Sequence, residues 1–325
     1  MHDNTEAGWH EALENQADVV GRPQVLRAGI SRNVVRRRLG AGRWQRLHRG
    51  VYATFSGPRP REAQLWAALL RAGPGATLSH YTAAELHGLI DSPADQIHVT
   101  VPATRNPARQ RKITGLVIHR SCRIEAARHP VLSPPRTRVE DTVLDLVEAA
   151  HDFDEAFAWI SRAVGQRRTT TLLLATAAAA RKRMRWRTEL TAALTDVADG
   201  VHSLLERRYV TGVERAHGLP RAARQVRRRH GTDGTRSTYI DNLYVEYDAC
   251  VEVDGSVAHP ADQRWSDIRR DNVNTASGSA TLRFGWTDIT QHPCQVAMLV
   301  ADTLRRRGWQ GTLRSCSPTC PAARS

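Results

Sequence analysis

The first part of the chain alternates apolar and polar positions with the periods of three short helices followed by a β-hairpin. Pro23 can occupy the first turn of the second helix, Gly29 can end it, and Ser31 is a suitable N-cap for the third. We therefore predict a winged helix-turn-helix over residues 1–56. The expected elements are helices at residues 9–17, 23–28 and 32–39 and a hairpin within residues 44–52.

A Pro-rich break at residues 57–60 separates this unit from a region of mixed pattern. Segments 97–102 and 116–120 have the apolar, β-branched character of strands, whereas helical spacing dominates residues 137–194. We expect residues 57–198 to form an α/β middle region.

The last third of the chain predicts the order αββαβα over residues 199–310. Ser203 and Glu206 form the capping box that opens its first helix. A tail rich in Ser, Pro and Cys, residues 311–325, is expected to be disordered. The fold class is therefore a multidomain protein of the α+β or α/β type. The expected C-terminal elements are helices at residues 203–217, 266–276 and 291–308 and strands at residues 237–245, 249–253 and 281–284.

Length and charge add a domain count and a preference for polyanions. The 325 residues suggest two or three domains, and 47 Lys and Arg against 33 Asp and Glu give a net charge of +14. Nearly all of the basic residues are Arg, which neutralises phosphates well. A codon composition that favours Arg over Lys also produces such an excess, so the charge alone leaves both interpretations open.

The apolar pattern also bears on location. No apolar run approaches the roughly 18 residues of a transmembrane helix. The polar and acidic start of the chain, Met1 to Glu6, does not resemble a signal peptide. We therefore expect a cytoplasmic protein without membrane contact.

The cysteines and histidines show no compact metal motif. Five cysteines are an odd number, so a disulfide framework is not expected. Cys316 and Cys320 resemble half of a metal clip, but no second pair lies near them, and we interpret them as thiols of a loose tail. Four histidines with no ligand-like spacing are interpreted as packing or surface residues, namely His80, His87, His98 and His119.

The predicted third helix and hairpin carry candidate nucleic-acid contacts. A recognition helix needs donors for phosphates and base edges on one face, and a basic hairpin suits the backbone beside the groove. The other interpretation is a solvated, Arg-rich helix in a small structural domain. The candidate DNA-binding residues are Arg32, Asn33, Arg36, Arg37, Arg43, Arg46, His48 and Arg49.

Acidic residues gather where buried strands are predicted near the C-terminus. Glu252 and Asp254 share one face of a strand, and Asp241 on the neighbouring strand can join them. Three carboxylates on one patch repel unless a cation lies among them, and oxygen ligands suit Mg²⁺ or Mn²⁺. Such an ion can activate water for attack on a phosphodiester.

Further residues can support this site. His259 can transfer protons near neutral pH, and Asp267 and Arg270 share a helix face. Each also has a plainer interpretation, because Asp254-Gly255 is a common hairpin turn and Glu206 is a helix cap. The pair Asp267 and Arg270 can equally be a surface ion pair. The candidate catalytic residues are Asp241, Glu252, Asp254, His259, Glu206, Asp267 and Arg270, of which the first three are the metal ligands.

These C-terminal residues resemble the DUF559 domain, a family similar to the very-short-patch-repair (Vsr) endonucleases of the PD-(D/E)XK superfamily. The resemblance covers about residues 201–309, and its specific part is the Glu-x-Asp-Gly-x3-His pattern ending at His259 with a later Asp-x2-Arg. It implies a restriction-endonuclease-like fold in which Asp241 binds metal and His259 is the catalytic histidine. Glu252 and Asp254 fall at the (D/E)-x-K position, where Asp254 replaces the usual lysine.

The front of the chain resembles the N-terminal winged helix of the AbiEi family of type IV antitoxins. The resemblance rests on the segment from Val25 to Ile30 and the wing Arg46-Leu47-His48-Arg49-Gly50-Val51-Tyr52-Ala53. The following Ser79-His80-Tyr81-Thr82-Ala83-Ala84 is similar to the next region of that family. The resemblance implies DNA binding, repression of the family's own operon and a cognate toxin as partner.

These observations lead to a prediction with two alternatives. The leading hypothesis is a DNA-binding protein whose C-terminal domain cleaves DNA phosphodiesters with Mg²⁺ or Mn²⁺. The alternative is a non-catalytic, antitoxin-like transcriptional repressor with a degenerate nuclease fold. An RNA-directed nuclease or binder also remains, because phosphate contacts do not report the sugar.

Overall fold

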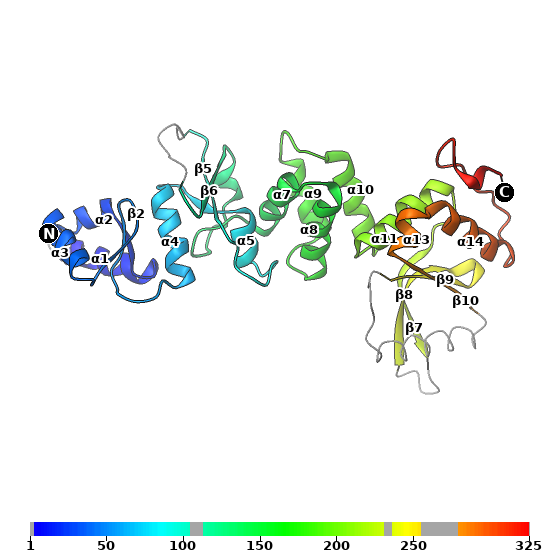
Figure 1. Ribbon diagram of the computed structural model, residues 1–325, viewed down its shortest axis with the longest axis horizontal. Helices are drawn as coiled ribbons and strands as arrows, with labels where there is room; N and C mark the ends of the chain where they lie inside the picture. Colours follow the sequence, from blue (N-terminus) through cyan, green and yellow to red (C-terminus); the bar gives the residue numbers. More distant parts are fainter. Residues whose placement is uncertain (1–2, 105–112, 231–235, 255–278, 325) are drawn as a thin grey trace. The chain divides into compact units, whose positions relative to one another are not determined.

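The structure is a computed structural model that describes residues 3–104, 113–230, 236–254 and 279–324. The chain divides into two compact units, residues 1–152 with 166–185 and residues 153–165 with 186–325. Both units mix helices with small sheets, as the predicted fold class states (Figure 1). Within the described ranges, no helix has the length and apolar character that crossing a membrane requires.

The N-terminal part of the first unit is consistent with the predicted winged helix. Three helices accompany a three-stranded antiparallel sheet of order β1-β3-β2, in which β1 lies between α1 and α2 and the hairpin β2-β3 follows α3. Ser31 caps α3 as expected, because its Oγ accepts a hydrogen bond from the Val34 backbone N at 3.4 Å. The elements are α1 (Asp3–Asn15), β1 (Val19–Gly21), α2 (Arg22–Arg27), α3 (Arg32–Gly40), β2 (Gln45–His48) and β3 (Val51–Ala53).

The helix α4 (Arg61–Ala72) is apolar on two faces, and each face completes a different core. Ala63 and Ala67 pack against Val19 and the other buried residues of the winged-helix sheet. Leu65 and its neighbours on the other face pack against a second sheet. The Pro-rich break predicted as a domain boundary therefore precedes a helix that both parts share.

The second sheet has the order β4-β5-β6, and its predicted strands are present. Strands β5 and β6 run parallel, with Ile97 opposite Leu116. Arg181 holds the later segment of this unit, residues 166–185, to the helix that carries Asp141 and Asp145. Its Nη2 lies 2.8 Å from Asp145 Oδ1 and 3.0 Å from the Asp141 carbonyl. The elements are β4 (Thr77–Leu78), α5 (His80–Leu86), β5 (Ile97–Pro102), β6 (Leu116–Ser121), α6 (Ile124–Ala127), α7 (Val139–Ala149) and α9 (Thr171–Ala179).

Two helices that we assigned to the middle region pack with the C-terminal unit instead. They are α8 (Phe153–Gly165) and α10 (Arg187–Ala198). The guanidinium of Arg207 lies 4.7 Å from the Phe153 ring centroid, and Arg208 pairs with Asp154. These contacts are not visible in the local pattern, which placed the boundary at the Asp199-Gly200 turn.

The C-terminal unit contains a four-stranded sheet of order β10-β9-β8-β7. Strands β7, β8 and β9 are antiparallel, and β10 joins β9 in parallel. The sequence did not predict β7, and the helix predicted at residues 266–276 lies outside the described residues. The elements are α11 (Leu204–Arg208), the π-helical turn η2 (Tyr209–Arg215), β7 (Ala223–His230), β8 (Arg236–Tyr244), η3 (Val245–Tyr247), β9 (Ala249–Asp254), β10 (Ala280–Gly285), α13 (Trp286–Gln291), α14 (Pro293–Arg305) and η4 (Pro321–Arg324).

One face of this sheet packs against η2 and α14, and an ion pair is buried at that interface. Glu214 on η2 accepts a hydrogen bond from Arg224 of β7, with Nη2 and Oε1 2.6 Å apart. The two side chains are only 4% and 6% exposed, respectively. The Ala222 backbone N also donates to Glu214 Oε2 at 3.1 Å, and Tyr244 of β8 reaches the same oxygen. The pair therefore fixes the helix against two strands.

The C-terminal segment differs from the expected disordered tail. The Arg314 backbone N donates to the His217 carbonyl at 2.8 Å, and Leu313 packs against the sheet core. Cys320 and Ala322 are buried, and η4 packs beside α14 (Figure 1). A composition rich in Ser and Pro did not reveal these anchors, since each depends on a partner far away in the sequence.

We predict that Arg224→Ala destabilises the C-terminal unit by about 3–5 kcal/mol, because it leaves the Glu214 carboxylate buried without its counter-charge. The control is Arg221→Ala, whose guanidinium is 70% exposed and pairs with Asp199. It should cost at most about 1 kcal/mol. Chemical denaturation of both variants measures the difference. Equal losses in the two variants would contradict the prediction.

Candidate functional sites

The exposed face of α3 carries the predicted recognition residues. Arg32, Asn33, Arg36 and Arg37 are all exposed, while Val35 is buried in the winged-helix core. Because residues four apart share a helix face, these side chains form two adjacent polar rows. The Ser31 cap and the buried Val35 together hold this face outward.

The hairpin adds three exposed arginines, but one of its predicted contacts has another environment. Arg43, Arg46 and Arg49 are exposed. His48 is half-buried, and its pKa is lowered by that burial and by the nearby charges of Arg71 and Arg59. His48 is therefore neutral at pH 7 and can contribute a hydrogen bond but not a charge.

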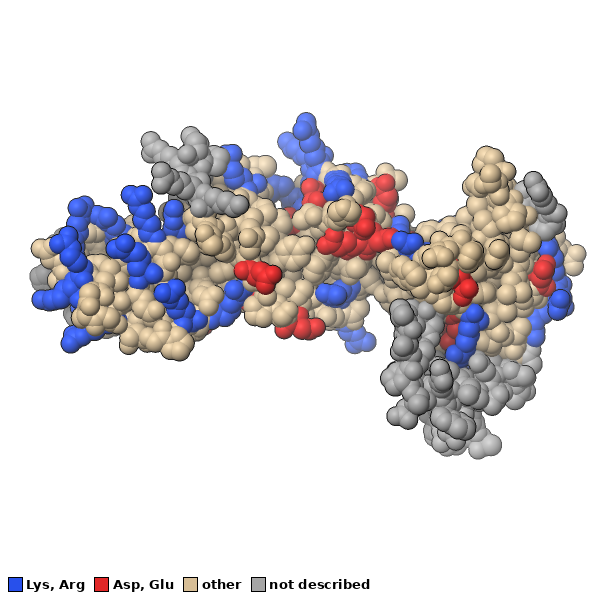
Figure 2. All heavy atoms as spheres, viewed as in Figure 1, with Lys and Arg blue, Asp and Glu red and all other residues tan. Residues whose placement is uncertain are grey.

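A concave surface of about 480 Å³ lies between α2, α3 and the hairpin. Its wall is partly apolar, through Val25 and Tyr52, and partly basic. Figure 2 shows Lys and Arg side chains over this N-terminal part of the unit. The arginines that line the concave surface are Arg22, Arg32, Arg36 and Arg46.

These arginines lie in a stretch without carboxylates. No acidic residue occurs between Asp18 and Glu62. Arg38 of α3 instead packs within the winged helix, since its guanidinium lies 4.9 Å from the Trp44 ring centroid. The exposed arginines therefore concentrate positive charge in a stretch of sequence that holds no acid, which favours a polyanion.

The predicted carboxylate site is brought together in part. The β8–β9 register pairs Asn242 with Val251, so Asp241 and Glu252 are the next residues on adjacent strands. Asp241 Oδ2 accepts a hydrogen bond from the Val253 backbone N at 3.0 Å, and Oδ1 accepts one from Gln225 Nε2 at 3.2 Å. Glu252 is 8% exposed. Asp241 therefore has a structural role in the sheet, in addition to any role in binding a ligand.

Glu206 lies close to the same edge of the sheet. Burial raises its pKa, and the negative charge of Asp241 raises it further. Ser203 caps the helix as predicted, with its Oγ 3.1 Å from the Glu206 backbone N. The Glu206 carboxylate accepts from the His202 backbone N at 2.9 Å, so it has a capping role.

The remaining predicted catalytic residues are outside what the structure describes. The side chain of Asp254, at the end of β9, is not described. His259, Asp267 and Arg270 fall within residues 255–278, which are also outside the described ranges. Their roles stay predictions from the sequence.

Three histidines that we interpreted as packing or surface residues form one cluster in the first unit. The rings of His80 and His119 stack with centroids 3.7 Å apart, and His98 Nδ1 lies 3.0 Å from His119 Nε2. One ring nitrogen of each lies within 4.8 Å of the others. Burial and the neighbouring imidazoles lower the pKa of His80 to about 2 and that of His119 to about 4. The cluster is therefore uncharged at neutral pH.

The other group of potential ligands was also missed from the sequence. His217, Cys294, Cys316 and Cys320 converge in the second unit. The available signal was that three of the five cysteines fall in the last 32 residues of the chain. Their separation from His217 concealed the arrangement.

We predict that acid destabilises the first unit through the histidine cluster in chelator-treated protein. Unfolding lets His80 and His119 take up protons below about pH 6.5, whereas the folded chain resists until about pH 4 or lower. Stability therefore falls as the pH falls through this window. Asp145 opposes the fall by one proton, because burial raises its pKa to about 6.

His80→Gln should reduce the slope of unfolding free energy against pH, since the largest of the proton-binding differences in the cluster is removed. Denaturant unfolding at several pH values between about 7 and 4.5 measures that slope. The exposed His10, replaced by Gln, is the control and should leave the slope unchanged. A wild-type slope in His80→Gln would refute the assignment.

Comparisons with known proteins bear on the front of the chain. Residues 11–54 match the family model described as transcriptional regulator, AbiEi antitoxin, so an antitoxin-type regulator domain occupies this segment. The crystal structure of the RV2827C protein from Mycobacterium tuberculosis is similar with a TM-score of 0.40 and 15% identity, covering 57% of this chain and 74% of that one. No curated protein matches. None of these comparisons supports a DUF559 or Vsr-like nuclease domain.

Proposed function

We propose that the chain is a DNA-binding transcriptional regulator of the antitoxin type that contacts duplex DNA through its winged helix. One observation carries the proposal. The segment that matches a regulator family, residues 11–54, also presents the exposed arginines of α3 and the hairpin without a compensating acid after Asp18. Of the two predicted functions, this alternative has the better support.

The positions of the exposed residues suggest that some contact base edges and others contact phosphates. Arg32 and Asn33 lie at the N-terminal end of α3, the part of a recognition helix that reaches base edges. Both side chains can bond to base edges in the major groove, Arg to guanine and Asn to adenine. Arg46 and Arg49 on the hairpin are placed to meet phosphates, which fix the register without reading sequence.

The family description also motivates a protein partner. An antitoxin acts on a cognate toxin, so we include such a toxin among the proposed partners. Duplex DNA is the first partner to test because its proposed contacts can be named residue by residue.

We expect Arg36→Ala/Arg37→Ala to weaken binding to a mixed-sequence DNA duplex by at least about tenfold at moderate salt. The slope of log affinity against log salt should also fall by about 0.9 for each phosphate that the variant no longer neutralises. Fluorescence anisotropy across a salt series measures both quantities.

A charge-matched control is Lys182→Ala/Arg183→Ala, which removes two exposed positive charges from another loop of the same unit. It should bind DNA nearly as the wild type does. If both double variants lose the same affinity, general charge and not the winged helix is responsible. Stronger binding to an RNA duplex of the same sequence would favour the RNA alternative.

We propose metal-dependent DNA cleavage by the C-terminal unit as a second candidate function. The observation that favours it is the adjacency of Asp241 on β8 and Glu252 on β9, with Glu206 close enough for Asp241 to raise its pKa. Their carboxylate oxygens are the donors that Mg²⁺ or Mn²⁺ takes. Asp241 and Glu252 would hold the ion, with Asp254 as the third ligand predicted from the sequence.

The ion would supply Lewis-acid activation of water and stabilisation of phosphate charge. His259 as the proton-transfer group, and Asp267 and Arg270 as supporting residues, complete the proposal from the sequence alone. Because Asp241 already accepts two hydrogen bonds, its substitution has to preserve shape.

Asp241→Asn keeps that shape while removing the charge, and it should abolish Mg²⁺-dependent nicking of supercoiled plasmid by the full chain. The control is Glu246→Gln, an exposed acid on η3 that should nick as the wild type does. Manganese is assayed in parallel. Nicking that is absent in the wild type, or equal in wild type and Asp241→Asn, would remove the nuclease candidate and leave the regulator.

A further inference from the structure

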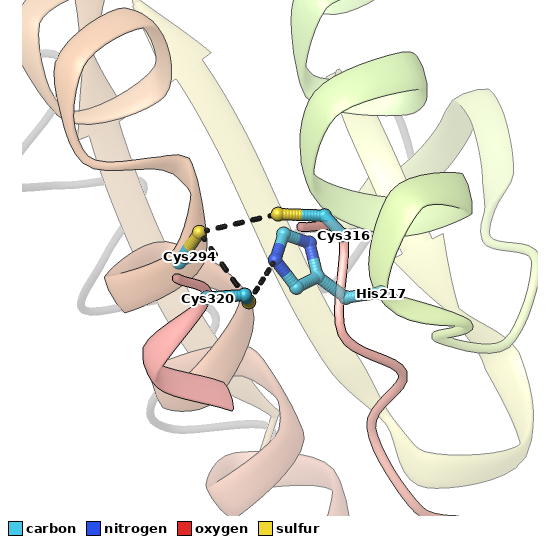
Figure 3. A group of neighbouring side chains, drawn as sticks. All are labelled: His217, Cys294, Cys316 and Cys320. Atoms are coloured by element: carbon cyan, nitrogen blue, oxygen red, sulfur yellow. Dashed lines mark hydrogen bonds between the residues drawn. The ribbon is translucent and has the colours of Figure 1, made fainter. Parts of the chain in front are cut away.

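Four potential metal ligands from three distant segments meet in the C-terminal unit. His217 is the last residue of the helical run that begins with α11, and Cys294 is the second residue of α14. Cys316 and Cys320 belong to the C-terminal segment. Figure 3 shows the four side chains pointing towards one another. One donor atom of each lies within 4.8 Å of all the others.

The distances match the edges of a coordination tetrahedron. Zn–S bonds of about 2.3 Å and a Zn–N bond of about 2.0–2.1 Å give S···S edges of about 3.8 Å and S···N edges of about 3.6 Å. The observed Sγ···Sγ distances are 3.5 Å for Cys294–Cys316 and 3.7 Å for Cys294–Cys320. Cys320 Sγ lies 3.6 Å from His217 Nε2. A disulfide, at about 2.0 Å, is a different arrangement, and all three thiols are free.

The histidine is oriented as a ligand. His217 is fully buried, and its Nδ1 lies 3.0 Å from the Val213 carbonyl. A carbonyl only accepts, so Nδ1 carries the proton and the Nε2 lone pair faces the three sulfurs. A hydrogen bond of this kind on the other ring nitrogen is the usual support of a metal-bound imidazole.

The chain path brings the C-terminal cysteines to this point. The Arg314 backbone N donates to the His217 carbonyl at 2.8 Å. Next to it, Gly218 has a φ of +69°, and a Cβ there would lie 3.0 Å from the Arg314 side chain. Cys316 and Cys320 then follow with three residues between them, a spacing common in zinc sites.

We propose that His217, Cys294, Cys316 and Cys320 bind one Zn²⁺ ion that fastens the C-terminal segment to the second unit. Three thiolates and one imidazole are a donor set that selects zinc over Mg²⁺ or Mn²⁺. Four protein ligands leave no open position, so the site is structural and not catalytic. Binding replaces the thiol protons, which leave to solvent. The proposal does not depend on the DNA-binding function.

The test is the zinc content of the full chain, purified without chelator and measured by elemental analysis. We expect about one equivalent in the wild type and a loss of most of it in Cys316→Ser. Cys316 is exposed, so this substitution removes a ligand without disturbing a packed core. Cys122→Ser replaces another exposed cysteine outside the cluster and should keep the full equivalent.

Two further measurements separate a bound ion from a folding defect. Co²⁺ added to chelator-treated wild type should give the intense visible absorption of tetrahedral thiolate coordination, and Cys316→Ser should not. A chelator should lower the melting temperature of the wild type but leave that of Cys316→Ser unchanged. A wild type that takes up no zinc, or a variant that binds as much as the wild type, would overturn the proposal.

Discussion

A single buried carboxylate sets the arrangement of the C-terminal unit. Glu214 is 3% exposed, and a charge in that position costs several kcal/mol unless it is paired and hydrogen-bonded. Arg224 and the Ala222 backbone satisfy it from the start of β7, and Tyr244 approaches from β8. These contacts hold the helix against the sheet.

Other features of the unit follow from that position. Three residues after Glu214, the same helical run ends at His217, whose backbone carbonyl holds the C-terminal segment. On the strands, β8 and β9 carry Asp241 and Glu252 to neighbouring positions. The cluster of His217 with the three cysteines and the pair of Asp241 and Glu252 thus both depend on how the sheet lies against this helix.

The arginine excess has two physical roles that a net charge cannot distinguish. In the C-terminal unit, Arg215, Arg221, Arg224 and Arg228 each form an ion pair with an acidic residue. In the winged helix, none of the arginines from Arg22 to Arg49 pairs with an acidic residue that the structure describes. The first group supports the fold, and the second is available to an external anion.

What the sequence predicts well are elements whose cause is local. The N-cap at Ser31, the hairpin and the strand at residues 97–102 follow from adjacent residues, and the structure confirms them. Strand β7 escaped prediction because half of its residues are arginines, with no apolar alternation to mark a strand. Its place in the sheet comes from antiparallel pairing with β8, which a local pattern does not show.

The candidate sites follow the same rule. The adjacency of Asp241 and Glu252 could be predicted from strand periodicity, but the hydrogen bonds that occupy Asp241 could not. The meeting of His217 with Cys320 joins residues 103 positions apart, and no spacing motif encodes it. Only the packed helices and sheet bring these two side chains together.

The helix α4 gives the first unit a property that its sequence divisions conceal. Ala63 and Ala67 complete the core of the winged helix, while Leu65 and Leu69 complete that of the next sheet. If one core opens while α4 stays in the other, the apolar face that α4 turned towards the opened core becomes exposed to water. Opening either core alone is therefore unfavourable. We therefore expect the winged helix and the second sheet to unfold together, so that a change in the stability of one is transmitted to the other.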